Sequence, residues 1–272
     1  MVTTTNNIEN NTLHKLSIQV SLNGLSFCTL NNDGAIVDYH YDNFGIQLSP
    51  EQVLDKVKNE LNRNSKLAYS FEEVEVIHQN DLYTFVPKAL FDEHHLQDYL
   101  KYSIKLLETD FIDYDEIEQL DMVCVYVPYT NLNNYFFETF GSFTYTHVLT
   151  SFLNQITLYN KNLKEKVIYV NLHSRSVDII AMVDNKVVLT NSHRHENRED
   201  FMYYILFTAE QLNFNPEDFR LSLFGQIDKN DSYYEIAYKY IRNISLGGIL
   251  PSQEILNNGD DFKTHKFLTL LS

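Results

Sequence analysis

The residues best suited to bind an anion are Ser174, Arg175 and Ser176, which stand together between two apolar segments. A guanidinium group can contact two phosphate oxygens at once, and an anion or nucleotide could therefore be held at this position. The same three residues are also typical of a solvated hairpin turn. The hairpin turn is the interpretation that we favour.

Two other clusters contain potential metal ligands. His193 and His195 are separated by one residue beside Glu196, and on a strand this spacing places both imidazoles on one face. The surrounding segment is polar and no second ligand cluster accompanies it, so we expect a polar loop without a metal. The acidic stretch 110–121 suggests calcium, but the glycine of an EF-hand loop is missing and isoleucines interrupt the pattern. We expect a solvated acidic surface there.

Composition excludes several classes of function. The chain of 272 residues has a formal net charge of −16, which repels the phosphates of nucleic acids and anionic membranes. No stretch resembles a signal peptide or the ~18 consecutive apolar residues of a membrane-spanning helix. Cys28 and Cys124 lie in apolar, strand-like segments and are expected to be buried free thiols. These features predict a cytoplasmic protein that binds no nucleic acid and does not insert into a membrane.

Sequence signatures of common catalytic sites are missing. The chain has no Gly-x-Gly-x-x-Gly, no Walker A sequence and no Gly-x-Ser-x-Gly, and it contains only eight glycines. A catalytic triad is recognised by geometry rather than by sequence position, and nothing in the sequence points to one.

The elements that must position these residues form two similar series. Each series consists of three strands, a helix, a strand and a helix, first near 15–78 and again near 166–242. Asn23-Gly24 is a strong signal for the hairpin that opens the first series. The strands of the two meanders are expected at 15–22, 25–30 and 35–44, and at 167–172, 176–183 and 186–191.

The region between the two meanders contains further helices and strands. Ser49 and Gln52 have the spacing of a capping box, which predicts that a helix begins at Pro50. The elements expected after it are a strand at 71–78, a strand at 82–86, a helix at 94–107, an acidic loop with a helical turn at 108–121, a strand at 122–127, a helix at 131–140, a strand at 142–146 and a bridging helix at 149–159.

This repeated lobe resembles the actin-like ATPase superfamily, which includes sugar kinases, heat-shock chaperone ATPases and bacterial actin relatives of cell division and pilus assembly. The segment Lys166–Asn213 resembles the start of the second lobe in these proteins, and Phe219–Ile227 is similar to the later strand and turn that contact the adenosine. As a whole, the sequence looks most like an uncharacterised bacterial family with this fold, closest in style to pilus-assembly adaptors. The resemblance implies an α/β protein with duplicated actin-like (ribonuclease H-like) lobes, each a three-stranded meander followed by alternating helices and strands.

The resemblance also implies a nucleotide site, and this chain departs from it. In the superfamily each lobe supplies an Asp-x-Gly turn, whose acid serves Mg²⁺ and whose glycine lets the backbone approach a phosphate. The turn ending in Asn23 and Gly24 has no Asp or Glu. In the second turn Asn171 stands where the acid would be and His173 where the glycine would be. The adenosine turn retains only Gly225 where relatives usually have two or three glycines.

These departures favour a non-catalytic adaptor or scaffold that binds a partner protein of unknown identity, with a homodimer as an open alternative. A divergent ATPase or kinase with unusual cleft residues is the second hypothesis, and a different α/β packing is the third. No cofactor is expected, although a nucleotide could bind without being hydrolysed. The cleft candidates are Asn23, Gly24, Asn171, His173, Ser174, Arg175, Ser176 and Gly225. The expected divisions are a disordered tail at 1–14, a first lobe at 15–147 with an inserted subregion near 80–120, and a second lobe at 148–272.

Overall fold

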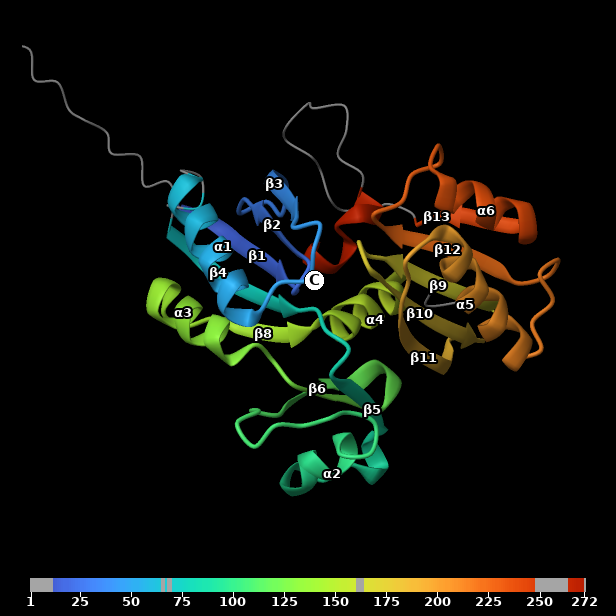
Figure 1. Cartoon of the computed structure of the whole chain (residues 1–272), viewed down its shortest axis with the longest axis horizontal. Helices are drawn as coiled ribbons and strands as arrows, with labels where there is room; N and C mark the ends of the chain where they lie inside the picture. Colours follow the sequence, from blue (N-terminus) through green and yellow to red (C-terminus); the bar gives the residue numbers. More distant parts are fainter. Residues whose placement is uncertain (1–11, 65–66, 68–69, 160–163, 248–263, 272) are drawn as a thin grey trace, which may run out of the picture.

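Two five-stranded sheets with the same strand order form the frame of the described part of the chain (Figure 1). The computed structural model describes residues 12–64, 67, 70–159, 164–247 and 264–271. In each sheet the first three strands are antiparallel, and the last two join them in parallel. The first sheet has the order β3-β2-β1-β4-β8, with β1 (Thr12–Val20), β2 (Gly24–Leu30), β3 (Ile36–Asn43), β4 (Ser70–His78) and β8 (Thr144–His147).

The second sheet repeats this arrangement. Its order is β11-β10-β9-β12-β13, with β9 (Lys166–Leu172), β10 (Ser176–Val183), β11 (Lys186–Arg194), β12 (Arg220–Gly225) and β13 (Asn243–Leu246). The predicted duplication of an α/β lobe is confirmed. Strand β13 was not foreseen, and β11 extends through Arg194, so His193 lies on a strand rather than in the predicted polar loop.

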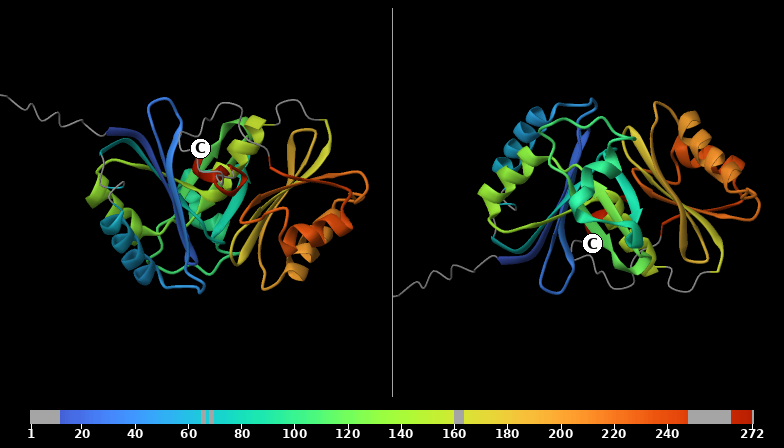
Figure 2. Two further views of the ribbon diagram at one scale, coloured as in Figure 1. Left: turned by 90° about the horizontal axis from the view of Figure 1, so that it is seen from above. Right: turned by 90° about the horizontal axis from the view of Figure 1, so that it is seen from below.

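Helices cover the outer face of each sheet (Figure 2). Helices α1 (Pro50–Arg63) and α3 (Thr130–Phe140) pack on the first sheet, and α5 (Arg198–Gln211) and α6 (Ser232–Tyr240) pack on the second. The predicted capping box of α1 is present, because Ser49 Oγ accepts from Gln52 N and Gln52 Oε1 accepts from Ser49 N at 2.9 Å. The cap satisfies two backbone groups that the start of a helix leaves without partners.

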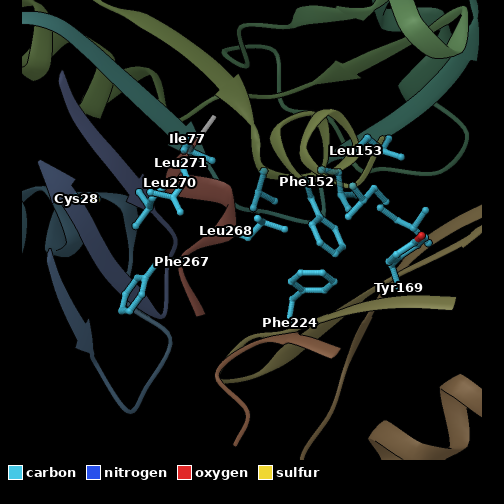
Figure 3. Close-up of a cluster of buried hydrophobic side chains, with 14 of the residues drawn as sticks. Cys28, Ile77, Phe152, Leu153, Tyr169, Phe224, Phe267, Leu268, Leu270 and Leu271 are labelled. Carbon is cyan, nitrogen blue, oxygen red and sulfur yellow. The ribbon is translucent and has the colours of Figure 1, made fainter. Parts of the chain in front are cut away.

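Helix α4 (Val148–Tyr159) lies between the lobes, together with two short turns near the C-terminus, η5 (Thr264–Lys266) and η6 (Leu268–Leu271). One buried apolar cluster joins α4, η6 and the preceding Phe267 to both five-stranded sheets (Figure 3). At its centre Phe152 of α4 meets Phe224 of β12 edge to face, with ring centroids 5.3 Å apart. Other members of the cluster are Cys28, Ile77, Leu153, Tyr169, Phe267, Leu268, Leu270 and Leu271. The space between the inner faces of the lobes is therefore filled with side chains.

A third sheet, of order β5-β7-β6, is inserted between β4 and α3. It consists of β5 (Tyr83–Pro87), β6 (Asp113–Ile117) and β7 (Met122–Tyr126), and it projects from the two lobes in Figure 1. The helix predicted at 94–107 is wrong in length, since α2 covers only Leu96–Leu100 after a short turn at Glu93–His95. The acidic segment 108–121 is not merely a loop, because β6 lies within it and pairs with β7.

Acidic side chains of β6 attach this insert to the first lobe. Asp115 accepts hydrogen bonds from Tyr126 Oη, Thr146 Oγ1 and His147 N at 3.1, 2.7 and 2.8 Å, and Tyr145 donates to Asp113. Removal from water raises the pKa of the Asp115 carboxyl. The prediction of a solvated acidic surface is therefore wrong for these two residues.

The remaining sequence predictions concern the thiols and the tail. Cys28 and Cys124 are buried free thiols, as predicted, and burial raises the pKa of Cys28 to about 12. Of the predicted tail at 1–14, residues 1–11 lie outside the described residues, and residues 12–14 belong to β1. None of the helices in the described ranges combines the length and the apolar character needed to cross a bilayer.

Candidate functional site

The turn between β1 and β2 and the turn between β9 and β10 lie at the junction of the two lobes, where they line two adjoining cavities. The smaller cavity has a volume of about 30 Å³, which is enough for a few water molecules at most. Beside it lies a wider cleft of about 870 Å³. Ser21, Gln79 and Ser174 line both spaces, so the two cavities adjoin each other.

Polar side chains from three parts of the chain line the small cavity and bond to one another. Gln19 Nε2 donates to Gln79 Oε1 at 2.9 Å, and Thr269 Oγ1 donates to the Oε1 of the same Gln19. Ser151 Oγ in turn donates to the carbonyl oxygen of Thr269 at 2.7 Å, and Gln155 Nε2 donates to that of Leu271 at 2.9 Å. The C-terminal turn is thus held between the lobes, where it leaves only the small cavity open.

All eight sequence-predicted candidates line one of these two spaces. Gly24, Asn171, His173, Ser174 and Gly225 line the small cavity, and Asn23, Ser174, Arg175 and Ser176 line the cleft. The two turns, which are about 150 residues apart in the sequence, are therefore brought together by the fold. Lining a cavity is a matter of position alone, and binding by these residues stays a prediction.

Asp178 is the acidic residue that sequence reasoning missed. It lies on β10 directly opposite Asn171 of β9, is buried, and lines the cleft. Its two carboxylate oxygens accept from His173 Nε2 and Ser192 Oγ, each at 2.6 Å. Burial favours the neutral acid, but the neighbouring His173 and these two hydrogen bonds outweigh it and lower the pKa of Asp178. A charged residue inside the apolar run SVDIIAMV was the signal that could have revealed it.

The order of hydrogen bonds in this cluster does not activate a nucleophile. In a catalytic triad the imidazole lies between the hydroxyl group and the carboxylate. Here Asp178 lies between His173 and Ser192, and Ser192 Oγ is also 2.9 Å from Tyr83 Oη. The described residues contain no group of three or more His, Cys, Asp or Glu placed to bind a metal.

His193 and His195 contact different parts of the second lobe. The His193 ring stacks on Tyr204 at a centroid distance of 4.1 Å. The buried His195 has Nε2 at 3.2 Å from the carbonyl oxygen of His173 and Nδ1 at 3.3 Å from Tyr233 Oη. Burial lowers the pKa of both imidazoles. Each side chain thus has a packing role. The predicted loop is wrong at His193, which lies on β11, whereas His195 lies in the loop between β11 and α5.

Gly225 allows a close approach of two strands. It has φ +83°, and a Cβ atom there would stand 2.1 Å from the carbonyl oxygen of Leu172, its partner on β9. Gln226 N donates to the same oxygen at 2.7 Å. The packing of β12 on β9 therefore requires a glycine at this position, whatever the cleft binds.

We expect Gly225→Ala to lower the free energy of unfolding by roughly 2–5 kcal/mol. The alanine would have to adopt a left-handed backbone conformation, and its Cβ atom would overlap with the carbonyl oxygen of Leu172. The matched control is Gly34→Ala. Gly34 has φ +76°, and a Cβ atom added there would have no atom within 4 Å, so only the cost of the left-handed backbone, about 1–2 kcal/mol, remains. Urea denaturation of both variants measures the difference. Equal losses would contradict the close-approach explanation.

Comparisons with known proteins agree with the fold. Residues 3–244 match a family described as "Protein of unknown function (DUF3822)". Among curated proteins, no significant sequence relative is found.

Solved structures provide two strong matches. One is a Bacteroides thetaiotaomicron protein with an actin-like ATPase fold and unknown function, with TM-score 0.75 and 19% identity over 89% of this chain and 92% of that one. The other is a chain of the PilM–PilN type IV pilus biogenesis complex, with TM-score 0.60 and 10% identity over 95% and 96% of the two chains. At these identities the likeness establishes the actin-like fold alone.

Proposed function

We propose that this chain, which belongs to the protein family of unknown function DUF3822, is a non-catalytic actin-like protein that acts as a protein-binding adaptor or scaffold. The observation that carries the proposal is the small size of the cavity that both turns share with the C-terminal turn, beside the wider cleft that the turns also line. About 30 Å³ remain there, far below the roughly 300–1,000 Å³ of ordinary ligand pockets. The C-terminal turn and the Gln19–Gln79 pair occupy the rest.

The chemistry of the turns supports the same conclusion. Phosphoryl transfer needs a metal held by carboxylate oxygens and a backbone that approaches the phosphates closely. Asn171 offers an amide, and His173 directs its Nε2 to Asp178 rather than leaving room for a phosphate. The nearest buried carboxylate, Asp178, already has two hydrogen-bond partners.

A protein partner suits the surface and the composition. The net charge of −16 repels nucleic acids and anionic lipids. One solved structure with this fold belongs to the PilM–PilN type IV pilus biogenesis complex, which is a precedent for partner binding by an actin-like chain. The two free thiols, Cys28 and Cys124, are consistent with a cytoplasmic location.

The wider cleft favours one competing function, a divergent nucleotide-binding enzyme. Its volume of about 870 Å³ is within the range of ligand pockets, and Arg175 and Asp178 both line it. An exposed guanidinium group could grip a phosphate bidentately. The same cleft is lined by Asp81 and Arg194, which form an ion pair at 2.9 Å.

Thermal unfolding with and without nucleotide separates the two functions. A site with a Kd of about 10 µM would gain about 2.7 kcal/mol at 1 mM Mg-ATP, which would raise the Tm by roughly 5–10 °C for a chain of this length. We expect no such rise and no phosphate release, with an active ATPase of the same fold as the positive control. A saturable rise that Arg175→Ala abolishes, or steady ATP turnover, would replace our proposal with the enzyme.

A further inference from the structure

The insert between the lobes has an outer layer, which we define as residues 88–112. One face of sheet β5-β7-β6 packs towards α4, where Tyr83 and Phe85 join the apolar cluster between the lobes. The opposite face is covered by the outer layer, which contributes Leu100 and several half-buried apolar residues to a small separate core. In Figure 1, α2 of this layer lies at the end of the insert away from both lobes.

Four large apolar side chains of the outer layer are turned away from that core. Their exposed fractions are 71% for Leu90, 89% for Tyr102, 60% for Leu107 and 51% for Phe111. They lie within 22 residues of sequence, in a layer whose other apolar side chains already fill the small core. An outer layer that exposes four large apolar side chains over so short a segment is a candidate for binding another molecule.

The charge of the insert identifies the kind of molecule. Residues 83–126 contain ten acidic residues and three lysines, a formal charge of −7 out of −16 for the whole chain. Two of the three lysines are paired within the insert, Lys88 with Glu116 at 2.5 Å and Lys101 with Asp98 at 2.7 Å. Further acidic residues that lie near the four apolar residues in sequence are exposed. They include Glu93, Glu108, Glu118 and Asp121.

This charge argues against three occupants. A second copy of the chain would also carry −16 and would be repelled, as would anionic membranes and nucleic acids. A positively charged polypeptide is attracted by the same field and can bury apolar anchors against the exposed side chains.

We infer that the outer layer binds a basic, amphipathic segment of a partner protein, whose apolar side chains cover Tyr102 and its three apolar neighbours and whose lysines or arginines meet the surrounding carboxylates. The inference rests on the proposed adaptor function and gives that adaptor a docking surface. Hydrogen bonds of Asp115 to the first lobe and of Tyr83 to Ser192 of the second hold the sheet beneath this surface in place. A surface held in this way loses little conformational freedom on binding.

The probe for this surface is a fluorescein-labelled 18-residue amphipathic helix of leucine and lysine, compared with its counterpart of leucine and glutamate. We expect the lysine peptide alone to bind the full chain, with amide NMR shifts confined to residues 88–121. Tyr102→Ser and Leu107→Ser should each weaken binding at least tenfold. Tyr238→Ser on α6, at a residue 67% exposed, is the matched control and should leave the affinity unchanged.

Several results would overturn the inference. They are no binding of the lysine peptide, equal weakening by Tyr238→Ser and Tyr102→Ser, or shifts centred outside the insert. A concentration-dependent dimer in sedimentation that Tyr102→Ser abolishes would assign the surface to a second copy instead. The peptide test and the Mg-ATP test fail independently. If the lysine peptide does not bind, the docking surface is rejected but the non-catalytic function is not. If the protein turns over ATP, the non-catalytic function is rejected whether or not the peptide binds.

Discussion

Replacing Leu268 and Leu270 together by alanine should unfold a large fraction of the protein at 25 °C. Both side chains are buried in the apolar cluster between the lobes, where they contact elements from both halves of the chain. Each leucine-to-alanine change in such a position costs about 2–5 kcal/mol. The sum approaches the roughly 5–15 kcal/mol by which a native protein is stable.

Urea denaturation followed by circular dichroism tests this expectation, with the single variants measured alongside the double variant. The matched control is Leu158→Ala on α4, because Leu158 is exposed and should lose less than about 1 kcal/mol. If the double variant is as stable as this control, then the C-terminal turn does not join the lobes as the structure indicates.

Acidification to pH 5 should destabilise the protein through two buried histidines, His78 at the end of β4 and His147 opposite it on β8. Burial lowers the pKa of His78 to about 3 and that of His147 to about 4. Each Nδ1 accepts a backbone N–H, from Tyr129 at 3.4 Å and from Leu149 at 3.3 Å, so a proton added there would break the bond.

The sign of the effect follows from the direction of the shifts. The unfolded chain protonates its histidines near pH 6.5, whereas the folded state holds these two neutral down to pH 3–4. Stability is therefore fully present above pH 6.5 and is lost as the pH falls below it, by roughly 2 kcal/mol per histidine at pH 5.

Urea midpoints at pH 7.5 and pH 5 measure this loss. The double variant His78→Gln/His147→Gln should show a shallower dependence on pH, even if it is less stable at pH 7.5. His94→Gln, at an exposed position, should keep the wild-type dependence. An unchanged slope in the double variant would show that other groups cause the acid sensitivity.

Local signals predicted much of the frame. Alternating apolar residues and Asn23-Gly24 were sufficient for the first meander, and the Ser49 capping box fixed the start of α1. The insert was predicted poorly because its elements depend on contacts distant in sequence. Asp115 belongs to a strand because Tyr126 and Thr146 satisfy its carboxylate, and neither partner is visible from the acidic segment itself.

The sequence predicted where the candidate site lies, but not which side chains fill it. The resemblance located both turns, and all of the predicted residues line the two cavities. The occupant of the small cavity could not be foreseen, because Thr269 meets Gln19 across 250 residues of sequence. Asp178 stood out as a charge in an apolar strand, but its pairing with His173 and Ser192 depends on how β9, β10 and β11 align and is not visible in β10 alone.

The contact between Thr269 and Gln19 also has a consequence for the order of synthesis. Strand β1 is made well before residues 267–271, yet its contact with Thr269 and the apolar cluster beside it close only when those residues have been released. The inner face of the first lobe is therefore covered only after residues 267–271 have been made. We expect chains that stop before residue 267 to stay sensitive to proteases, because this apolar face then lacks its cover.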